Sequence, residues 1–130
     1  MMDITGGITS FLVHSALDAL TSRQKVIANN IANANTTGFS PIRMAFEQQL
    51  QHLASLSVQP NIESTLVRKF GDFEHDLLNG RMAQTEKGKS VELDVEMARL
   101  TDNLIRYQAL LEGMSKRTAV LKMAVTGGRG

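Results

Sequence analysis

The 130-residue sequence contains no cysteine, no tryptophan, one tyrosine and two prolines. The absence of cysteine excludes disulfides and thiolate metal sites. Aromatic residues make up only 5% of the chain, although a core of this size normally draws much of its apolar area from aromatic rings. The core is therefore expected to be aliphatic, which suits helices packed along seams better than a sandwich of sheets.

Strong charge of either sign is also missing. The formal net charge is +1, and the basic residues occur in scattered pairs without neighbouring aromatics, so neither nucleic acid nor anionic lipid is an expected partner. The sequence contains no run of 18 apolar residues, so no transmembrane helix is expected. The N-terminus lacks the basic region of a secretory signal, so we expect export, if it occurs, to leave the N-terminus uncleaved.

Catalytic and cofactor motifs are absent as well. The three histidines are far apart, and neither a phosphate-binding loop nor a framed nucleophile is present. Asp72, Glu74 and Asp76 resemble the start of a calcium loop, but the required later glycine and glutamate are missing. The sequence therefore predicts no enzyme activity, no metal, no cofactor and no small-molecule substrate.

Helical periodicity is the main positive signal at the N-terminal end. From about Ile8 to Ala34, apolar residues alternate spacings of four and three, which is typical of a heptad seam, and Gln24 is its one polar member. The predicted seam positions are Val13, Leu17, Leu20, Ile27 and Ile31.

A second and longer seam runs from about Val91 to Val125 and is expected to stop at Gly127 and Gly128. Such a helix would be about 50 Å long, whereas a compact domain of this size has a radius of gyration of roughly 14 Å. An elongated hairpin of two terminal helices, or a subunit of an assembly, is therefore expected. The seam positions are Leu93, Met97, Leu100, Leu104, Tyr107, Leu111, Met114, Thr118, Leu121 and Val125.

The middle of the chain shows weak periodicity. Met44 to Leu56 predicts a short helix, Ser57 to Phe70 reads as extended or irregular, and Gly71 to Gly88 as a loop. The prediction is thus one elongated, mainly α domain in three parts: an N-terminal helix in residues 1–37, a weakly structured segment in 38–89 and a C-terminal helix in 90–130.

Two motifs at the ends carry a family resemblance. IANNIANANTTGF, at Ile27–Phe39, resembles the N-terminal signature of the flagellar axial proteins, the rod and hook family. The C-terminal half is similar to the same family in its Val-acid-Leu and Glu-Met pattern (Val91, Glu92, Leu93, Glu96, Met97) and in the run RYQALLEGMSKR. The short chain resembles the proximal rod subunits more than the distal rod or hook subunits, which carry inserted domains.

This resemblance implies terminal helices paired as an antiparallel coiled coil, and many subunits stacked into a helical tube that surrounds an export channel and transmits torque. It implies export through the flagellar type III apparatus to a rod in the periplasm. The implied partners are further copies, other rod subunits, a rod adapter protein, the MS-ring protein and the export gate. A different short rod subunit, or a small helical adapter or chaperone-like binding module, is the alternative.

The implied coiled coil would place Val13, Leu17, Leu20, Ile27 and Ile31 against Leu100, Leu104, Tyr107, Leu111 and Met114 within one subunit. The asparagines between the seam residues would then point elsewhere. Amides offer both a donor and an acceptor on one short side chain, which can fix the register between neighbours. We therefore expect intersubunit contacts at Asn29, Asn30, Asn33, Asn35, Gly38 and Phe39.

Overall fold

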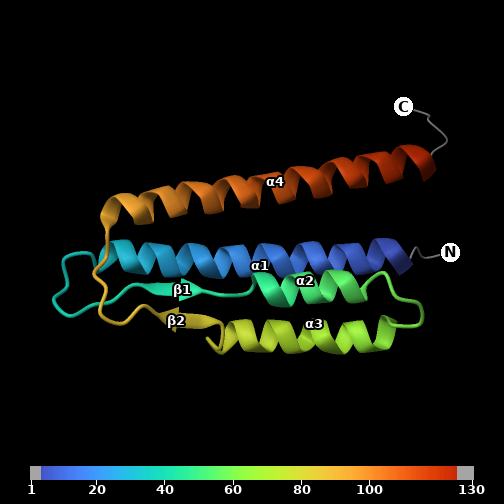
Figure 1. Ribbon diagram of the computed structural model, residues 1–130. Coiled ribbons are helices and arrows are strands. Elements are labelled where there is room, and N and C mark those ends of the chain that lie inside the picture. Colours follow the sequence, from blue (N-terminus) through green and yellow to red (C-terminus); the bar gives the residue numbers. More distant parts are fainter. Residues whose placement is uncertain (1–3, 126–130) are drawn as a thin grey trace.

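The computed structural model describes residues 4–125 and is mainly α-helical (Figure 1). Two long helices form the two ends of the chain, and the sequence between them contains two shorter helices and two short strands that pair as a small sheet. The predicted stop at Gly127 and Gly128 lies outside the described residues. The elements are α1 (Ile4–Ala32), β1 (Ile42–Met44), α2 (Glu47–Leu56), α3 (Glu63–Leu78), β2 (Ala83–Thr85) and α4 (Leu93–Val125).

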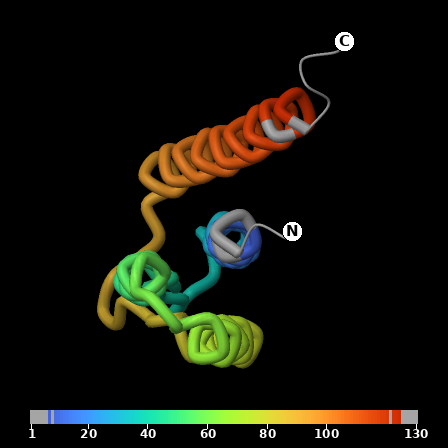
Figure 2. The backbone as a smooth tube through the Cα atoms, turned by 90° about the vertical axis from the view of Figure 1, so that its right-hand side faces the viewer, coloured from blue at the N-terminus to red at the C-terminus, as the bar shows by residue number. Residues whose placement is uncertain are grey.

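Helix α1 is the centre of the fold. It contacts α4 on one side, and α2, α3 and β1 on the other (Figure 2). Helices α1 and α4 run antiparallel, and they draw apart toward the C-terminal end of α4 (Figures 1 and 2). With 33 residues, α4 is about 50 Å long. None of the helices in the described part of the chain is both long enough and apolar enough to cross a membrane.

Helix α3 corrects the expectation for the middle segment. The predictions of extended structure before Phe70 and of a loop after it are wrong over residues 63–78, which form a 16-residue helix. Gly71 lowers helix propensity by about 1 kcal/mol. That cost is outweighed because four side chains at spacings of four and three are buried: Leu66, Phe70, Phe73 and Leu77.

The main hydrophobic core lies between α1 and this middle segment, and it is not purely aliphatic. Phe46, Phe70 and Phe73 are only 2–4% exposed, and the ring of Phe11 stacks on Phe70 with centroids 5.4 Å apart. Burying one such ring contributes about 2–3 kcal/mol. Few aromatics are therefore enough, because three of the five phenylalanines are concentrated in one cluster with Leu20, Leu53, Leu66, Leu77, Met44 and Met82.

The two-stranded sheet connects this core to α4. Strands β1 and β2 are antiparallel, with Arg43 opposite Gln84, and the Ala45 N–H donates to the Met82 carbonyl at 2.8 Å. The turn that leads from α1 into β1 contains Gly38 at φ 80°, a left-handed conformation that favours glycine. The two-stranded sheet thereby fixes the position of the Arg43 side chain beside α1 and α4.

Candidate functional site

The predicted seam residues of α1 lie on the side of the helix that faces the rest of the subunit. Leu17, Leu20 and Ile27 are buried, at 8%, 5% and 3% exposure, and Val13 and Ile31 are half-buried. Leu20 belongs to the core cluster with the middle segment. The predicted seam residues of α1 therefore pack against two neighbours, α3 and α4, because α1 lies between them.

On α4, the inward face is rotated relative to the predicted seam. From Glu96 to Met114, its buried and half-buried residues again alternate spacings of four and three, but the series includes two polar side chains, Glu96 and Asn103. Leu100, Tyr107 and Met114 belong to it, whereas Leu104 and Leu111 are 45% and 38% exposed. The inward face consists of Glu96, Leu100, Asn103, Tyr107, Leu110 and Met114.

A carboxylate is completely buried on this face. Glu96 has 0% exposure, and its two oxygens accept hydrogen bonds from both Nη atoms of Arg43, with Nη1 to Oε2 at 3.0 Å. Asn30 Nδ2 donates to the same Oε2 at 3.2 Å, and Arg43 Nε donates to Glu86 Oε1 at 2.7 Å. We call these four residues the Glu96 cluster. A buried charge is tolerated only when it is paired and hydrogen-bonded in this way.

The protonation of the cluster follows from these contacts. The hydrogen bond to Glu96 raises the pKa of Arg43 further above its already high ordinary value. The hydrogen bond from Lys89, with that from Arg43, lowers the pKa of Glu86. Arg43 and Glu86 are therefore charged at neutral pH. The cluster joins α1, β1 and α4 by directional bonds that fix their register.

Asn30 corrects one of the predicted intersubunit contacts. Its side chain is fully buried, and its Oδ1 accepts from the Ile42 N–H at 2.9 Å while its Nδ2 donates to the Ile42 carbonyl at 2.9 Å. Nδ2 also donates to Glu96. All hydrogen bonds of its amide are thus made within the subunit. The amide bonds the N–H and the carbonyl of Ile42, as the backbone of a neighbouring strand would.

Asn30→Leu is therefore expected to lower the free energy of unfolding by about 2–3 kcal/mol, because two backbone groups of Ile42 and the Glu96 carboxylate lose a buried partner. Chemical denaturation followed by circular dichroism measures this. The control is Asn29→Leu, on the exposed side of the same turn, which should change stability by less than about 0.5 kcal/mol. Equal stability of the two variants would contradict the role assigned to Asn30.

The other asparagines remain candidates for contacts between subunits. Asn33 Nδ2 donates to the Asn29 carbonyl at 2.8 Å, and Thr36 Oγ1 donates to Asn33 Oδ1 at 3.1 Å, which closes the end of α1. Asn29, Asn35 and Gly38 are exposed. Phe39 is half-buried, so this turn offers both amide and aromatic surface beside the Glu96 cluster.

A second polar bridge crosses from α4 to α1. Asn103 Nδ2 donates to the Leu20 carbonyl at 2.9 Å and to Gln24 Oε1 at 2.8 Å. Gln24 is the one polar member of the predicted N-terminal seam. A polar residue at a seam position indicates a polar partner on the facing helix, so the sequence did point to this contact on the α1 side. Asn103 was not predicted, because the seam on α4 was assigned from apolar residues alone and a polar residue does not contribute to that pattern.

The surfaces of α4 on either side of its inward face differ: one is apolar and the other is charged. The apolar surface is a row of exposed side chains about 80° around the helix axis from the inward face. Their exposures of 38–52% leave apolar surface without an intrasubunit partner. We call this row the apolar stripe; it consists of Leu93, Met97, Leu104 and Leu111.

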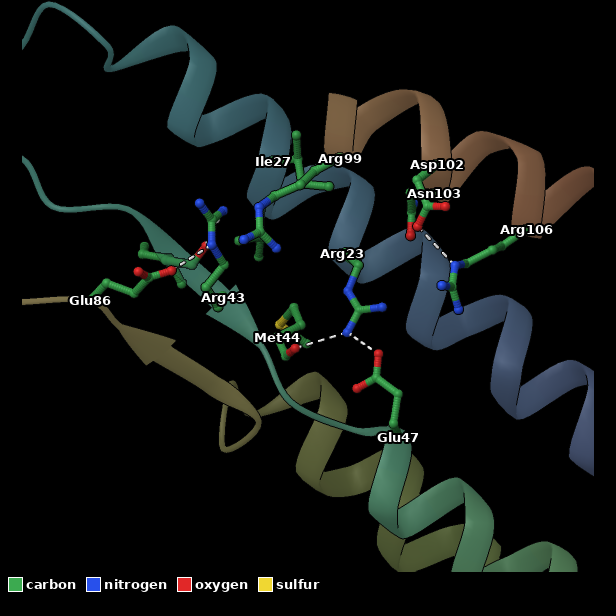
Figure 3. Close-up of a pocket in the computed structure, with 12 residues that line it drawn as sticks. Arg23, Ile27, Arg43, Met44, Glu47, Glu86, Arg99, Asp102, Asn103 and Arg106 are labelled. Atoms are coloured by element: carbon green, nitrogen blue, oxygen red, sulfur yellow. Dashed lines mark hydrogen bonds and ion pairs between the residues drawn. The ribbon is translucent and has the colours of Figure 1, made fainter. Parts of the chain in front are cut away.

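The opposite side of the inward face is charged and borders a cleft of 410 Å³ that α1, β1, α2 and α4 line (Figure 3). Arg23 pairs with Glu47 and lies over the ring of Phe46, with its Cζ 4.1 Å from the centroid. Burial tends to raise the pKa of Glu47, but its hydrogen bond from Arg23 prevails and the pKa is lowered. On α4, Arg106 donates to Asp102 at 2.9 Å.

The interface between α1 and α3 contains two carboxyl groups. Burial and the neighbouring Asp18 raise the pKa of Glu74, against a hydrogen bond from Ser15 that lowers it. The folded chain therefore holds a proton on Glu74 more tightly than the unfolded chain does. Its contribution to stability is lost as the pH rises from about 4.5, the unfolded value, through the higher folded pKa.

Glu74→Gln is accordingly expected to raise the melting temperature at pH 7 and to leave it nearly unchanged at pH 4. Thermal unfolding at both pH values measures the effect. Glu63→Gln, an exposed glutamate of the same helix, is the control for loss of charge alone. A lower melting temperature of the Glu74 variant at pH 7 would contradict the assigned carboxyl pair.

Comparison with known proteins identifies the family. A family model described as flagella basal body rod protein matches residues 14–39. The flagellar basal body rod protein FlgB of Bacillus subtilis (strain 168) is 32% identical over 120 residues, which cover 90% of this chain and 92% of that protein. The chain belongs to the FlgB family of flagellar basal body rod proteins. FlgB of Proteus mirabilis (strain HI4320) is 33% identical over 104 residues (72% of this chain, 76% of that protein), and FlgB of Aeromonas hydrophila 28% over 123 residues (91% and 93%).

As a FlgB-family member, the chain is a structural subunit of the proximal rod of the flagellar basal body, where rod components assemble with one another. The family match at 14–39 contains Asn30 and the Gly38 turn, the two features that lead the chain from α1 into β1. Among the described residues, no three His, Asp or Glu side chains are grouped to hold a metal ion.

Proposed function

We propose that copies of this chain form the proximal rod by packing their α1–α4 pairs side by side into a helical tube around the export channel. The observation that carries the proposal is the apolar stripe of α4, whose side chains at 38–52% exposure contact no other part of the subunit well enough to be buried. Burying four such side chains between subunits contributes several kcal/mol, at about 25 cal/mol per Å².

A groove between the separating ends of α1 and α4 supports the same proposal. It measures 360 Å³, and Val13, Leu110 and Met114 are among the side chains that line it. Helices that pair as a coiled coil insert side chains into such holes. In the proposed tube, side chains of a neighbouring helix fill this groove. Coiled-coil packing then extends along the whole length of the α1–α4 pair.

The proposed mechanism is packing, not catalysis. Torque is transmitted because the Glu96 cluster and the Asn103 bridge lock the two long helices in register, so the subunit rotates as a unit. The neighbours in this proposal are other copies, the rod subunit FlgC, the adapter FliE, the MS-ring protein and the export gate. The chain reaches the periplasmic rod through the flagellar type III apparatus with its N-terminus uncleaved.

Concentration dependence of the purified chain tests the proposal. We expect a monomer with a partly frayed α4 in dilute buffer, and larger species with higher helical content as the concentration rises. Sedimentation velocity and circular dichroism follow both changes. A compact monomer that melts sharply and never associates at any concentration would point instead to a free adapter or binding module.

A further inference from the structure

Two arginines on one side of α4 have no acidic partner within the subunit. Arg99 lines the cleft of 410 Å³ beside α4, and Arg117 lines the groove of 360 Å³ between the separating ends of α1 and α4. Neither forms an ion pair among residues 4–125. The other arginines of the cleft are paired, with Glu47, with Asp102 or within the Glu96 cluster. Two positive charges are therefore left on this side of α4.

Two carboxylates on the stripe side of the same helix have the same spacing. Asp94 and Glu112 each directly follow a leucine of the apolar stripe, and both are exposed. Neither forms an ion pair in the part of the chain that the structure describes. Eighteen residues separate the two carboxylates, and the same number separates the two arginines. At 3.6 residues per turn this is five full turns, so each set of two projects from a single side of α4.

The groove has room for large apolar side chains. Val13, Leu110 and Met114 line it. Gly113 lines it as well, and a Cβ added at this glycine would meet no neighbouring atom within 4 Å. Among the described residues, no helix other than α4 has more than two exposed large apolar side chains. Within this chain, the apolar stripe of α4 is therefore the surface that fits the groove.

The charges select one register for such a contact. An α4 helix from a second copy, parallel to the first and shifted by five residues, brings Asp94 beside Arg99. Because the spacings are equal, the same shift brings Glu112 beside Arg117, whereas any other parallel shift pairs at most one of the carboxylates. The carboxylates lie about 140° around the axis from the arginines, so one copy can contact two neighbours at once. Such a head-to-tail contact between identical subunits propagates into a ring or an open helix.

We propose that α4 of one copy packs against α4 of the next, parallel to it and shifted by five residues, with the apolar stripe over the groove. Asp94 pairs with Arg99 of the neighbouring copy, and Glu112 pairs with its Arg117. The same shift sets the incoming Leu111 at a level between Gly113 and Arg117, over the open part of the groove. This inference rests on the proposed assembly of copies into a rod, and it names the helix that fills the groove. Two charge pairs about 27 Å apart along the axis fix the register of each subunit on the next.

Charge exchange in cells tests the pairing. Glu112→Arg and Arg117→Glu are each expected to abolish swimming, because like charges would face each other at every contact, and the two together in one chain are expected to restore it. Arg68→Glu is the matched control: it reverses an exposed arginine of α3 that forms no ion pair, and should leave swimming unchanged. Circular dichroism of the purified variants should match that of the parent, since neither residue of the pair has an ionic partner in its own subunit. Normal swimming of either single variant, or a double variant as impaired as the single ones, would overturn the pairing.

Disulfide formation in basal bodies tests the direction and the shift, since the natural chain contains no cysteine. A chain with both Asp94→Cys and Arg99→Cys should form covalent dimers and longer species on mild oxidation. The control combines Asp94→Cys with Arg117→Cys, at positions that meet only if neighbouring α4 helices run antiparallel, and it should stay monomeric.

The outcomes separate this contact from the rod function. Cross-links in the control chain alone, or in neither chain although basal bodies contain it, would overturn the parallel contact and leave the rod function standing. Absence of the natural chain from purified basal bodies would overturn the proposed function as well.

Discussion

Glu96→Ala is expected to lower the free energy of unfolding by about 3 kcal/mol and to abolish rod formation. Removing one partner of a buried ion pair leaves the other charge without compensation, which is the costly way to break such a pair. Arg43, whose side chain is 20% exposed, would keep only Glu86, and Asn30 would lose one acceptor. Urea denaturation of the purified chain measures the loss.

Two companion variants make this prediction specific. Glu92→Ala removes an exposed carboxylate of the same segment and should change stability by less than about 0.5 kcal/mol. Replacing both partners, as Arg43→Met with Glu96→Leu, should cost less than Glu96→Ala alone, because no buried charge is left unpaired. If the double variant is less stable than the parent by the sum of the losses that Arg43→Met and Glu96→Leu each cause alone, the pair is not coupled.

Leu104→Asp is expected to leave the subunit folded but to abolish assembly and swimming. Leu104 is 45% exposed in the apolar stripe, so the charge meets water in the monomer. In the proposed tube it would be buried without a partner, at a cost of several kcal/mol per contact. Swimming assays report the loss in cells, and sedimentation velocity reports the loss of association in the purified protein.

The matched control for Leu104 is Leu78→Asp, which makes the same substitution on α3 at a leucine that is 84% exposed. It should neither unfold the chain nor prevent swimming. An unchanged swimming rate for Leu104→Asp would contradict the role of the stripe. Unfolding of purified Leu104→Asp would instead mean that the side chain is part of the intrasubunit core.

The long helices were predictable because their periodicity extends over many turns, but the rotation of α4 was not. Counting apolar residues favours Leu104 and Leu111, whereas the inward face contains Glu96 and Asn103. Those side chains are buried because β1 and α1 supply their hydrogen-bond partners from 53 or more positions away in the sequence. A local pattern on α4 carries no information about such distant partners.

The middle segment shows the opposite case, in which local signals were misleading. Pro60 and Asn61 do form a turn, and Asn61 has a φ of 56°, but the helix begins only two residues later, at Glu63. Gly71 suggested a loop, yet it is exposed in α3 with no neighbouring side chain to restrict it. The packing of Phe70 and Phe73 against α1 decided the structure, and propensity alone underestimates such tertiary contacts.

Electron cryo-microscopy of purified basal bodies tests the central claim most directly. We expect density for this chain in the rod next to the MS ring, with α1 and α4 along the tube wall. The apolar stripe (Leu93, Met97, Leu104 and Leu111) is expected to be buried against a neighbouring subunit. Basal bodies whose proximal rod lacks this chain, or subunits whose apolar stripe faces solvent, would contradict it.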